Sequence, residues 1–406
     1  MDGIGLVLEG GGARGSYQIG ACKALKEMGI EFSGVAGTSV GALNGAMIVQ
    51  DNLEEAYDFW SIISPDKIIN FTDEEVQELG HGGIRFAGFS YKINRFKKII
   101  AERGIDIRPL IDLLKSVINE EKIRKSRLDF GIVAFDITSV KPVEVYKEDI
   151  PEGKLVDYLI ASSTFPGFKP KEIDGRLYAD GGIYNVLPIN LMSNKGYKNI
   201  IAVRTFGIGR RKKFDEKELN ITYIAPAENL GPILDFSNER AKINLQLGYY
   251  DAIRVFKGLK GKRYYIKPYN DEDFFLEYLM GLSKEKIAKL CKLFGIEKSS
   301  SKRVLFEYII PKIASLLGAS ENASYEDISI ALIEKIADIS GVERFKIYDL
   351  ADLISEITRR YVPVKTDFLN EIPGFLMSID IVTKINRDKI LGSIANELFM
   401  DLAGAG

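Results

Sequence analysis

The chain has 406 residues, which is long for one core and favours two domains. Its hydrophobic content of 46% and charged content of 28% are ordinary for a soluble globular enzyme. Its 55 basic and 57 acidic residues leave a formal net charge of −2, which argues against bulk binding of nucleic acid. The two cysteines, Cys22 and Cys291, exclude a disulfide framework and a cysteine metal cluster, and they suit a reducing cytoplasm.

The first predicted element is a strand over IGLVLE (4–9), which runs into the glycine-rich GGGARG (10–15) and then into a helix. A glycine turn between a strand and a helix N-terminus directs backbone N–H groups toward an anion. Two anions suit this turn. One is a dinucleotide pyrophosphate, because Gly10, Gly12 and Gly15 fit G-x-G-x-x-G, and the other is the transient oxyanion of acyl transfer.

The second predicted strand, around FSGVAGT, ends in Ser39 rather than in the acidic residue that would hold a dinucleotide ribose. Ser39 lies between Gly37 and Gly41, and VGALNGAMIVQ continues as a helix. This G-x-S-x-G turn exposes a nucleophilic serine in many hydrolases, and glycines are needed there because larger side chains would collide. The pattern favours Ser39 as a nucleophile and leaves nucleotide binding as the alternative.

Three segments bear on contact with a membrane. GFSYKINRFKKII (88–100) has the spacing of a basic amphipathic helix, which fits either an anionic bilayer or the protein core. FFLEYLM (274–280) has the same ambiguity, whereas RRKKF (210–214) is expected to be a solvated turn rather than a binding patch. No signal-peptide pattern opens the chain, and no apolar run approaches the roughly 20 residues of a membrane span. We expect a cytoplasmic protein in which 88–100 is a surface helix packed on the core, with transient membrane-surface contact through this segment as the alternative.

A serine nucleophile needs a base, and the chain has a single histidine. His81 lies among glycines in ELGHGGIRF, without the late position that histidine has in α/β-hydrolases. Asp180 follows a short strand signal, RLYA, and precedes Gly181 and Gly182, which leave room for a substrate; a D-G hairpin turn is the alternative. An ordinary aspartate lacks roughly 3.5 kcal/mol of proton affinity relative to histidine, but burial and an oxyanion hole can offset this deficit for an ester. We therefore expect Asp180 to be the base.

Strand and helix signals alternate up to residue 265, and helical patterns follow. Further strands are predicted at 130–137, 142–146, 199–206 and 263–268. Helices are predicted in SKEKIAKLCKLFGI, SKRVLFEYIIPKIASLLGA, SYEDISIALIEKIADISG and IYDLADLISEITRRYV. The alternation indicates an α/β domain with a largely parallel sheet over 1–265. The succession of amphipathic helical patterns after it indicates an α-helical domain of unknown role over 266–406.

Taken together, GGGARG (10–15), GTSVG (37–41) and DGG (180–182) resemble, in this order, the three blocks of the patatin-like phospholipases. ASSTFPGFKP (161–170) is similar to the stretch that leads to the acid block of that family. The resemblance covers about residues 4–210 and continues weakly to about 255. One departure is Glu9, where the family often has aspartate.

The resemblance implies a three-layer patatin-like sheet domain in which Ser39 is the nucleophile and Asp180 the general base. It implies an oxyanion hole built from the backbone N–H groups of Gly11 and Gly12, with Arg14 holding the loop or helping with charge. The complete oxyanion loop comprises Gly10, Gly11, Gly12, Arg14 and Gly15. The implied reaction releases a fatty acid from a lipid ester through an acyl-serine, without a metal or cofactor. Acyl transfer to another acceptor and a non-catalytic lipid-binding or scaffold role stay open.

Overall fold

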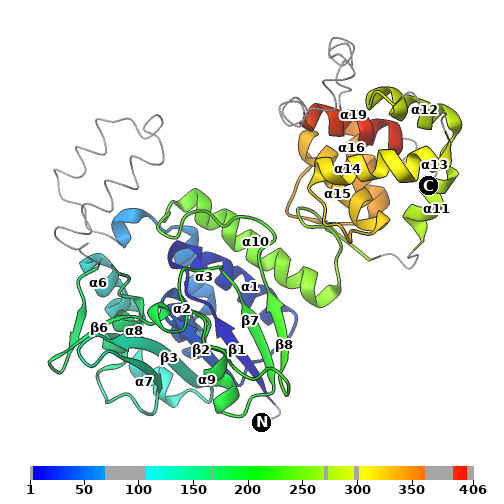
Figure 1. The fold of residues 1–406 in the computed structure, drawn as a ribbon. Coiled ribbons are helices and arrows are strands. Elements are labelled where there is room, and N and C mark those ends of the chain that lie inside the picture. Colours follow the sequence, from blue (N-terminus) through cyan, green and yellow to red (C-terminus); the bar gives the residue numbers. More distant parts are fainter. Residues whose placement is uncertain are drawn as a thin grey trace. The chain divides into compact units, whose positions relative to one another are not determined.

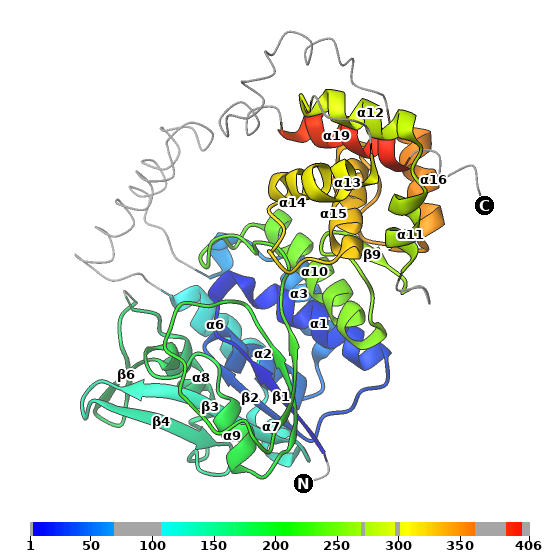
Figure 2. The same ribbon diagram turned by 45° about the vertical axis from the view of Figure 1, so that its right-hand side comes forward.

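The structure is a computed structural model that describes residues 3–68, 107–166, 168–268, 273–296, 301–361 and 387–399. The chain divides into two compact units, Met1–Val255 and Phe256–Gly406 (Figures 1 and 2). The first unit is mixed α/β and the second is mainly helical.

The first unit is built around an eight-stranded sheet in the order β5-β6-β3-β2-β1-β7-β8, with β4 also paired to β3. Neighbours among β3, β2, β1, β7 and β8 are parallel, whereas β4 and β6 run antiparallel to β3, and β5 runs antiparallel to β6. The strands are β1 (Ile4–Leu8), β2 (Gly34–Thr38), β3 (Asp129–Asp136), β4 (Lys141–Tyr146), β5 (Lys171–Ile173), β6 (Arg176–Asp180), β7 (Asn199–Val203) and β8 (Asn220–Ile224). The predicted α/β fold with a largely parallel sheet is confirmed.

Helices cover both faces of this sheet and give the unit three layers (Figure 1). Val35 of β2 faces Gly45 of α2, whereas Ala36, which points to the opposite face, belongs to a core cluster with Leu191 and Met192 of α9. The helices are α1 (Gly15–Glu27), α2 (Val40–Val49), α3 (Leu53–Ser61), α6 (Arg108–Val117), α7 (Glu120–Lys125), α8 (Leu155–Ser163), α9 (Ile189–Asn194) and α10 (Asn238–Lys257).

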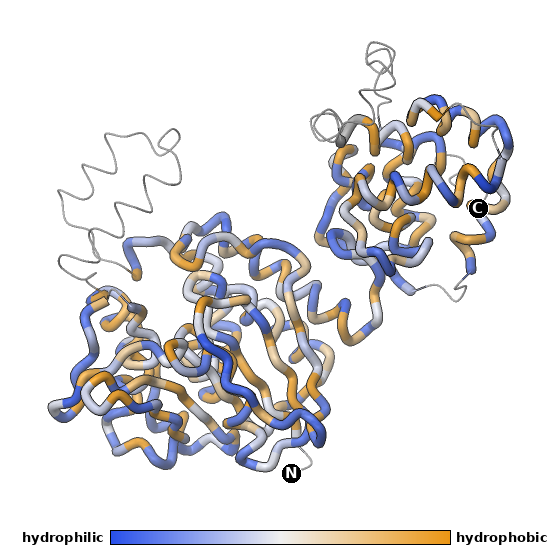
Figure 3. The backbone as a smooth tube through the Cα atoms, in the orientation of Figure 1, coloured by the Kyte–Doolittle hydropathy of each residue, from blue (hydrophilic) through white to orange (hydrophobic). Residues whose placement is uncertain are grey.

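The central strands are hydrophobic along their whole length because both of their faces are covered. All of β2 and the last four residues of β1 are buried, and the hydrophobic stretches of the backbone follow these strands (Figure 3). Polar groups are therefore confined to the ends of the strands, where the site residues lie.

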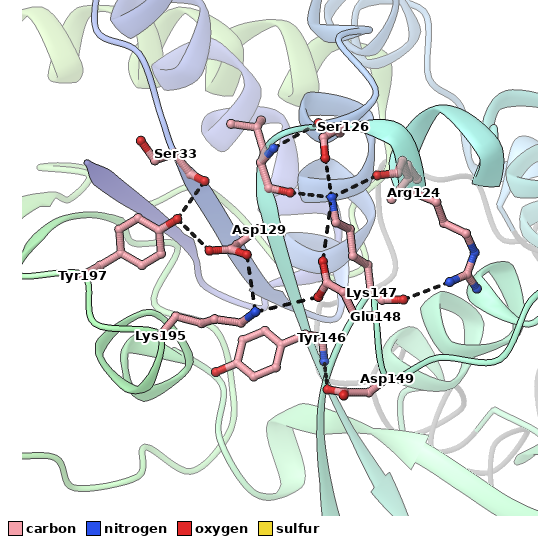
Figure 4. A network of polar contacts seen from close by, with 12 residues as sticks. Ser33, Arg124, Ser126, Asp129, Tyr146, Lys147, Glu148, Asp149, Lys195 and Tyr197 are labelled. Atoms are coloured by element: carbon pink, nitrogen blue, oxygen red, sulfur yellow. Dashed lines mark hydrogen bonds and ion pairs between the residues drawn. The ribbon is translucent and has the colours of Figure 1, made fainter. Parts of the chain in front are cut away.

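A network of polar contacts ties β2, β3 and β7 together at their amino ends (Figure 4). The Tyr197 hydroxyl oxygen lies 2.8 Å from the Ser33 carbonyl oxygen and 2.8 Å from Asp129 Oδ2. Lys195 Nζ lies 3.3 Å from Asp129 Oδ1 and 4.4 Å from the centre of the Tyr146 ring. These contacts stabilise the relative register of the three strands at the edge remote from Ser39.

The second unit has its own hydrophobic core, which includes the buried Phe275, Leu305, Ile333, Leu353 and Ile394. Its helices are α11 (Phe274–Gly281), α12 (Lys284–Leu293), α13 (Lys302–Val304), α14 (Ile310–Leu317), α15 (Tyr325–Ile339), α16 (Leu350–Arg360) and α19 (Arg387–Phe399), and Leu305–Ile309 form a π-helical turn before α14. The strand expected at 263–268 as part of the first domain is β9 (Tyr265–Ile266) of this unit, where it pairs in parallel with β10 (Ile347–Tyr348).

Candidate active site

Ser39 occupies the sharp turn between β2 and α2. Its φ of 57° and ψ of −130° lie in a region that residues with side chains rarely adopt, and such strain is found where a turn must expose a functional side chain. A Cβ atom on Gly37 would lie 2.2 Å from the Gly41 carbonyl oxygen, and one on Gly41 would lie 2.2 Å from the Leu8 carbonyl oxygen. Both glycines of the motif are therefore required by close backbone packing.

Asp180 is the last residue of β6, and the pairing of two strands with β3 brings it to Ser39. β4 pairs with β3 along one edge, so β2 and β6 share the other edge. On that edge Thr38 pairs with Val133, and Asp180 pairs with the next residue, Ala134. β2 therefore ends where β6 arrives, and the residue after Thr38 meets Asp180.

The carboxylate of Asp180 is almost completely buried, with 5% of the residue exposed. Burial raises its pKa from 3.8 to about 6, because the charged form loses its water, and the neighbouring Ser39 side chain and Gly182 N–H oppose part of this rise. The Gly182 N–H donates a hydrogen bond to Oδ1 at 2.7 Å. A Cβ on Gly181 would lie 2.2 Å from the Val133 carbonyl oxygen, so this glycine allows the turn to approach β3.

The glycine loop after β1 contributes donors to the same place. Gly10 donates its N–H to the Val186 carbonyl at 2.9 Å, and Ala13 donates to the Ile233 carbonyl at 2.8 Å. The N–H groups of Gly11 and Gly12 have no acceptor among the residues that the structure describes. Of the predicted loop residues, Gly11 and Gly12 are thus the ones with available N–H groups, whereas Gly10 lines the cavity but has used its own N–H group.

The side chain of Arg14 holds a neighbouring segment rather than entering the cavity. Its Nη1 donates to the carbonyl oxygens of Thr205 and Phe206 at 3.1 and 2.8 Å. From the other side, Oε2 of the buried Glu9 accepts the N–H groups of the same two residues at 2.7 and 2.9 Å. The Thr205 hydroxyl completes the connection by donating to the Gly10 carbonyl at 2.7 Å. Gly15, the last predicted member of the loop, begins α1 and packs against Val40 and Trp60.

Ser162 is a site residue that the sequence analysis did not single out. Its hydroxyl oxygen accepts the N–H of Ser39 at 2.9 Å and its proton is donated to the Val133 carbonyl at 2.6 Å. The sequence feature that could have identified Ser162 is its position in ASSTFPGFKP, the stretch before the acid block. Which of the two adjacent serines contacts Ser39, however, depends on the orientation of α8.

A cavity of about 160 Å³ opens beside Ser39 and Asp180. Its remaining lining is mainly apolar and comes largely from α2, α3, α6 and the segments after α3 and α8 and before α10, including Met47, Phe59, Trp60, Ile63, Leu114 and Phe236. One buried polar group is satisfied within the wall, since Trp60 Nε1 donates to Asn44 Oδ1 at 3.0 Å. A cavity of this kind favours an apolar group bound next to the Ser39 hydroxyl.

Two predicted features, His81 and the 88–100 segment, lie outside the described residues. Within the described ranges, no group of three His, Cys, Asp or Glu side chains is arranged as a metal site. Across the same ranges, the helices are all too short or too polar to cross a bilayer.

Comparison with known proteins identifies relatives for the part of the chain that contains Ser39 and Asp180. Residues 6–192 match the family model described as patatin-like phospholipase. An NTE family protein of Mycobacterium tuberculosis is 29% identical over 205 residues, which are 50% of this chain and 49% of that protein. Patatin-like phospholipase domain-containing protein 6 of Homo sapiens is 28% identical over 288 residues (65% of this chain, 18% of that protein). Lysophospholipase NTE1 of Kluyveromyces lactis is 27% identical over 281 residues (65% and 17%). The chain therefore spans about half the length of the mycobacterial relative and less of the other two.

Proposed function

We propose that this chain is a serine hydrolase that cleaves fatty acyl esters of lipids, since residues 6–192 match the patatin-like phospholipase family model. The observation that carries the proposal is the position of Ser39 beside the buried Asp180 carboxylate, where both residues line an apolar cavity. A hydroxyl beside a base and an apolar pocket is what attack on an acyl ester requires.

In the proposed reaction, Ser39 Oγ attacks the carbonyl carbon of the ester and its proton moves to Asp180. The carbonyl oxygen becomes an oxyanion that accepts the N–H groups of Gly11 and Gly12. When the tetrahedral intermediate collapses, the carbon–oxygen bond to the alcohol breaks, and the alcohol takes the proton from Asp180. Water then attacks the acyl-serine in the same way, so that the fatty acid leaves and the serine hydroxyl is restored.

The raised pKa of Asp180 supports its role as the base. A carboxylate with a pKa of about 6 binds a proton nearly as well as an ordinary histidine, whose pKa is about 6.5. It is still largely ionised at pH 7, so that it can accept the serine proton. A base of this strength suits an ester, whose alkoxide leaves more readily than the amine of an amide.

The proposed substrate is a glycerolipid such as a phospholipid or lysophospholipid, with one acyl chain in the cavity. The apolar lining from Met47 on α2 to Leu114 on α6 supports an alkyl chain rather than a dinucleotide at the Gly11–Gly12 donors. Nucleotide binding through this loop is accordingly the less favoured function.

A fluorophosphonate probe tests this proposal, because it reacts with activated serines. The wild type should be labelled and should release fatty acid from a lysophospholipid, whereas Ser39→Ala should do neither. Ser163→Ala is the matched control, since Ser163 also lines the cavity but its hydroxyl is bonded within α8 at 3.0 Å. Labelling of Ser39→Ala would refute the assignment.

A second readout separates hydrolysis from lipid binding without catalysis. Trp60, the only tryptophan of the chain, lines the cavity, so its fluorescence should change when a fatty acid binds. A wild type that changes fluorescence with fatty acid but is neither labelled nor active would support the non-catalytic alternative.

A further inference from the structure

The segment 206–213, between β7 and β8, exposes two large apolar side chains, one of which also lines the cavity. Phe206 is 49% exposed and Ile208 is 71% exposed, although Ile208 also contributes to the cavity lining. Ile183, in the turn after Asp180, is 38% exposed. Exposed apolar side chains that continue a binding cavity onto the surface are typical of an interaction site.

Backbone contacts hold this segment against both glycine-rich blocks of the site. Arg210 donates its N–H to the Gly182 carbonyl at 2.9 Å and accepts the Val186 N–H at 2.7 Å. A Cβ on Gly207 would lie 1.8 Å from the Gly10 carbonyl oxygen, so the segment also packs directly on the oxyanion loop. The backbone of Ile208 is therefore held beside the turn that carries Ile183, since a Cβ on Gly182 would lie 3.5 Å from the Ile208 carbonyl oxygen.

Cations follow the apolar residues immediately. Arg210, Arg211 and Lys213 are exposed, and the side chains of Arg210 and Lys213 form no ion pair with any residue that the structure describes. Arg211 lies 3.8 Å from Glu9, and Lys212 is bonded to Glu144 at 3.0 Å. Asp215, Glu216 and Glu218, which are all exposed, follow these cations together with Lys217, so the basic surface is confined to residues 210–213.

We propose that residues 206–213 dock on the surface of an anionic phospholipid bilayer. Phe206 and Ile208 enter the interface, while Arg210 and Lys213 bind lipid phosphates. Apolar side chains flanked by cations are the combination that an anionic interface selects, since burial and charge attraction act together. RRKKF is then a binding surface rather than the solvated turn expected from its sequence. Docking would bring the cavity beside Ser39 to the lipid. This delivery of substrate rests on the proposed function, whereas the binding to the bilayer does not.

Vesicle cosedimentation tests the docking, and Ser39→Ala serves as the parent so that lipid is not hydrolysed. The parent should bind vesicles of phosphatidylcholine with phosphatidylglycerol more tightly than vesicles of phosphatidylcholine alone, and salt should weaken the binding. The added R210Q/K213Q pair should weaken binding to anionic vesicles roughly 20- to 30-fold, since each cation near such a surface contributes about fivefold. Ile208→Ser should remove the part of the binding that survives at high salt.

K26Q/K198Q is the matched control, because it removes the same charge from two exposed lysines elsewhere on the unit, in the last turn of α1 and just before β7. It should bind vesicles like the parent. In the active background, R210Q/K213Q should hydrolyse a soluble short-chain ester like the wild type. The docking proposal is overturned if the parent does not prefer anionic vesicles, or if R210Q/K213Q binds them no more weakly than K26Q/K198Q. Intact vesicle binding with no esterase activity in the wild type would count against the proposed function alone.

Discussion

The hydroxyl of Ser162 on α8 accepts a hydrogen bond from the backbone N–H of Ser39 at 2.9 Å and donates one to the Val133 carbonyl oxygen at 2.6 Å. Ser39 has a positive φ, which is unfavourable for a residue with a side chain. A contact that holds its N–H therefore stabilises the backbone conformation that presents the hydroxyl to Asp180. Because the Ser39 N–H is bonded to Ser162, it is not available to bind an oxyanion.

Replacing Ser162 tests this relationship. Ser162→Ala leaves the Ser39 N–H and the Val133 carbonyl without their partner, which should lower stability by about 1–3 kcal/mol. We expect kcat on a soluble ester to fall about tenfold with little change in KM, because the positioning of the nucleophile is affected rather than substrate binding. Ser163→Ala, whose hydroxyl bonds only within α8, should change kcat little. Equal effects of the two variants would rule out a positioning role for Ser162.

The identity of the base can be decided by two substitutions. Asp180→Asn keeps the shape of the side chain but cannot accept the serine proton as a carboxylate does, so activity should fall about 10²- to 10⁴-fold. His81→Ala should retain activity within a few-fold of the wild type. Both are measured as kcat/KM on a p-nitrophenyl ester, with circular dichroism as the check on folding. An inactive, folded His81→Ala variant beside an active Asp180→Asn variant would identify His81 as the base.

The pH dependence of activity should report the ionisation of Asp180. Burial raises the pKa of this carboxyl to about 6, and only its ionised form can take the serine proton. We expect kcat/KM to rise with pH and to level off above a midpoint near 6. His81→Ala should show the same midpoint. A profile in which this substitution moves the midpoint would contradict the assignment to the carboxylate.

The same pKa shift should make Asp180 destabilising at neutral pH. Its folded-state pKa lies above its unfolded value of 3.8, so the folded protein binds the proton more tightly. Stability from this group is present at low pH and is lost as the pH rises through about 6, by about 3 kcal/mol in total. Urea unfolding of wild type and Asp180→Asn should give similar stabilities at pH 4 and a more stable variant at pH 8. A difference that stays constant with pH would show that burial does not raise this pKa.

Gly12 should tolerate no side chain. Its φ is +57°, and a Cβ would lie 2.2 Å from the Ile233 carbonyl oxygen, which accepts the Ala13 N–H. Gly12→Ala should therefore displace the loop and abolish labelling by fluorophosphonate. Gly29→Ala is the control, because Gly29 has a φ of +74° but nothing within 4 Å of the added Cβ. It should lose only about 1 kcal/mol of stability from backbone strain and keep its activity. Normal labelling of Gly12→Ala would place the oxyanion donors elsewhere.

The local features of this protein could be predicted from its sequence because neighbouring residues determine them. The strand, glycine and serine pattern around Ser39 specifies a sharp strand-to-helix turn, since only glycines fit beside it. The helices of the second unit follow from apolar periodicity and from local caps such as Ser324, whose hydroxyl accepts the Asp327 N–H at 3.0 Å. The parallel sheet follows from the alternation of strand and helix signals.

Properties that depend on distant residues were decided only by the tertiary structure. The pKa of Asp180 depends on burial by elements far away in the chain. The availability of the Gly11 and Gly12 N–H groups, and not that of Gly10, follows from where Val186 places its carbonyl. The partner of β9 is β10, some eighty residues later, because a two-residue strand carries too little local information to select its neighbour. Sequence patterns identify which residue types can do the chemistry, whereas desolvation and hydrogen-bond partners arise only when separate segments pack together.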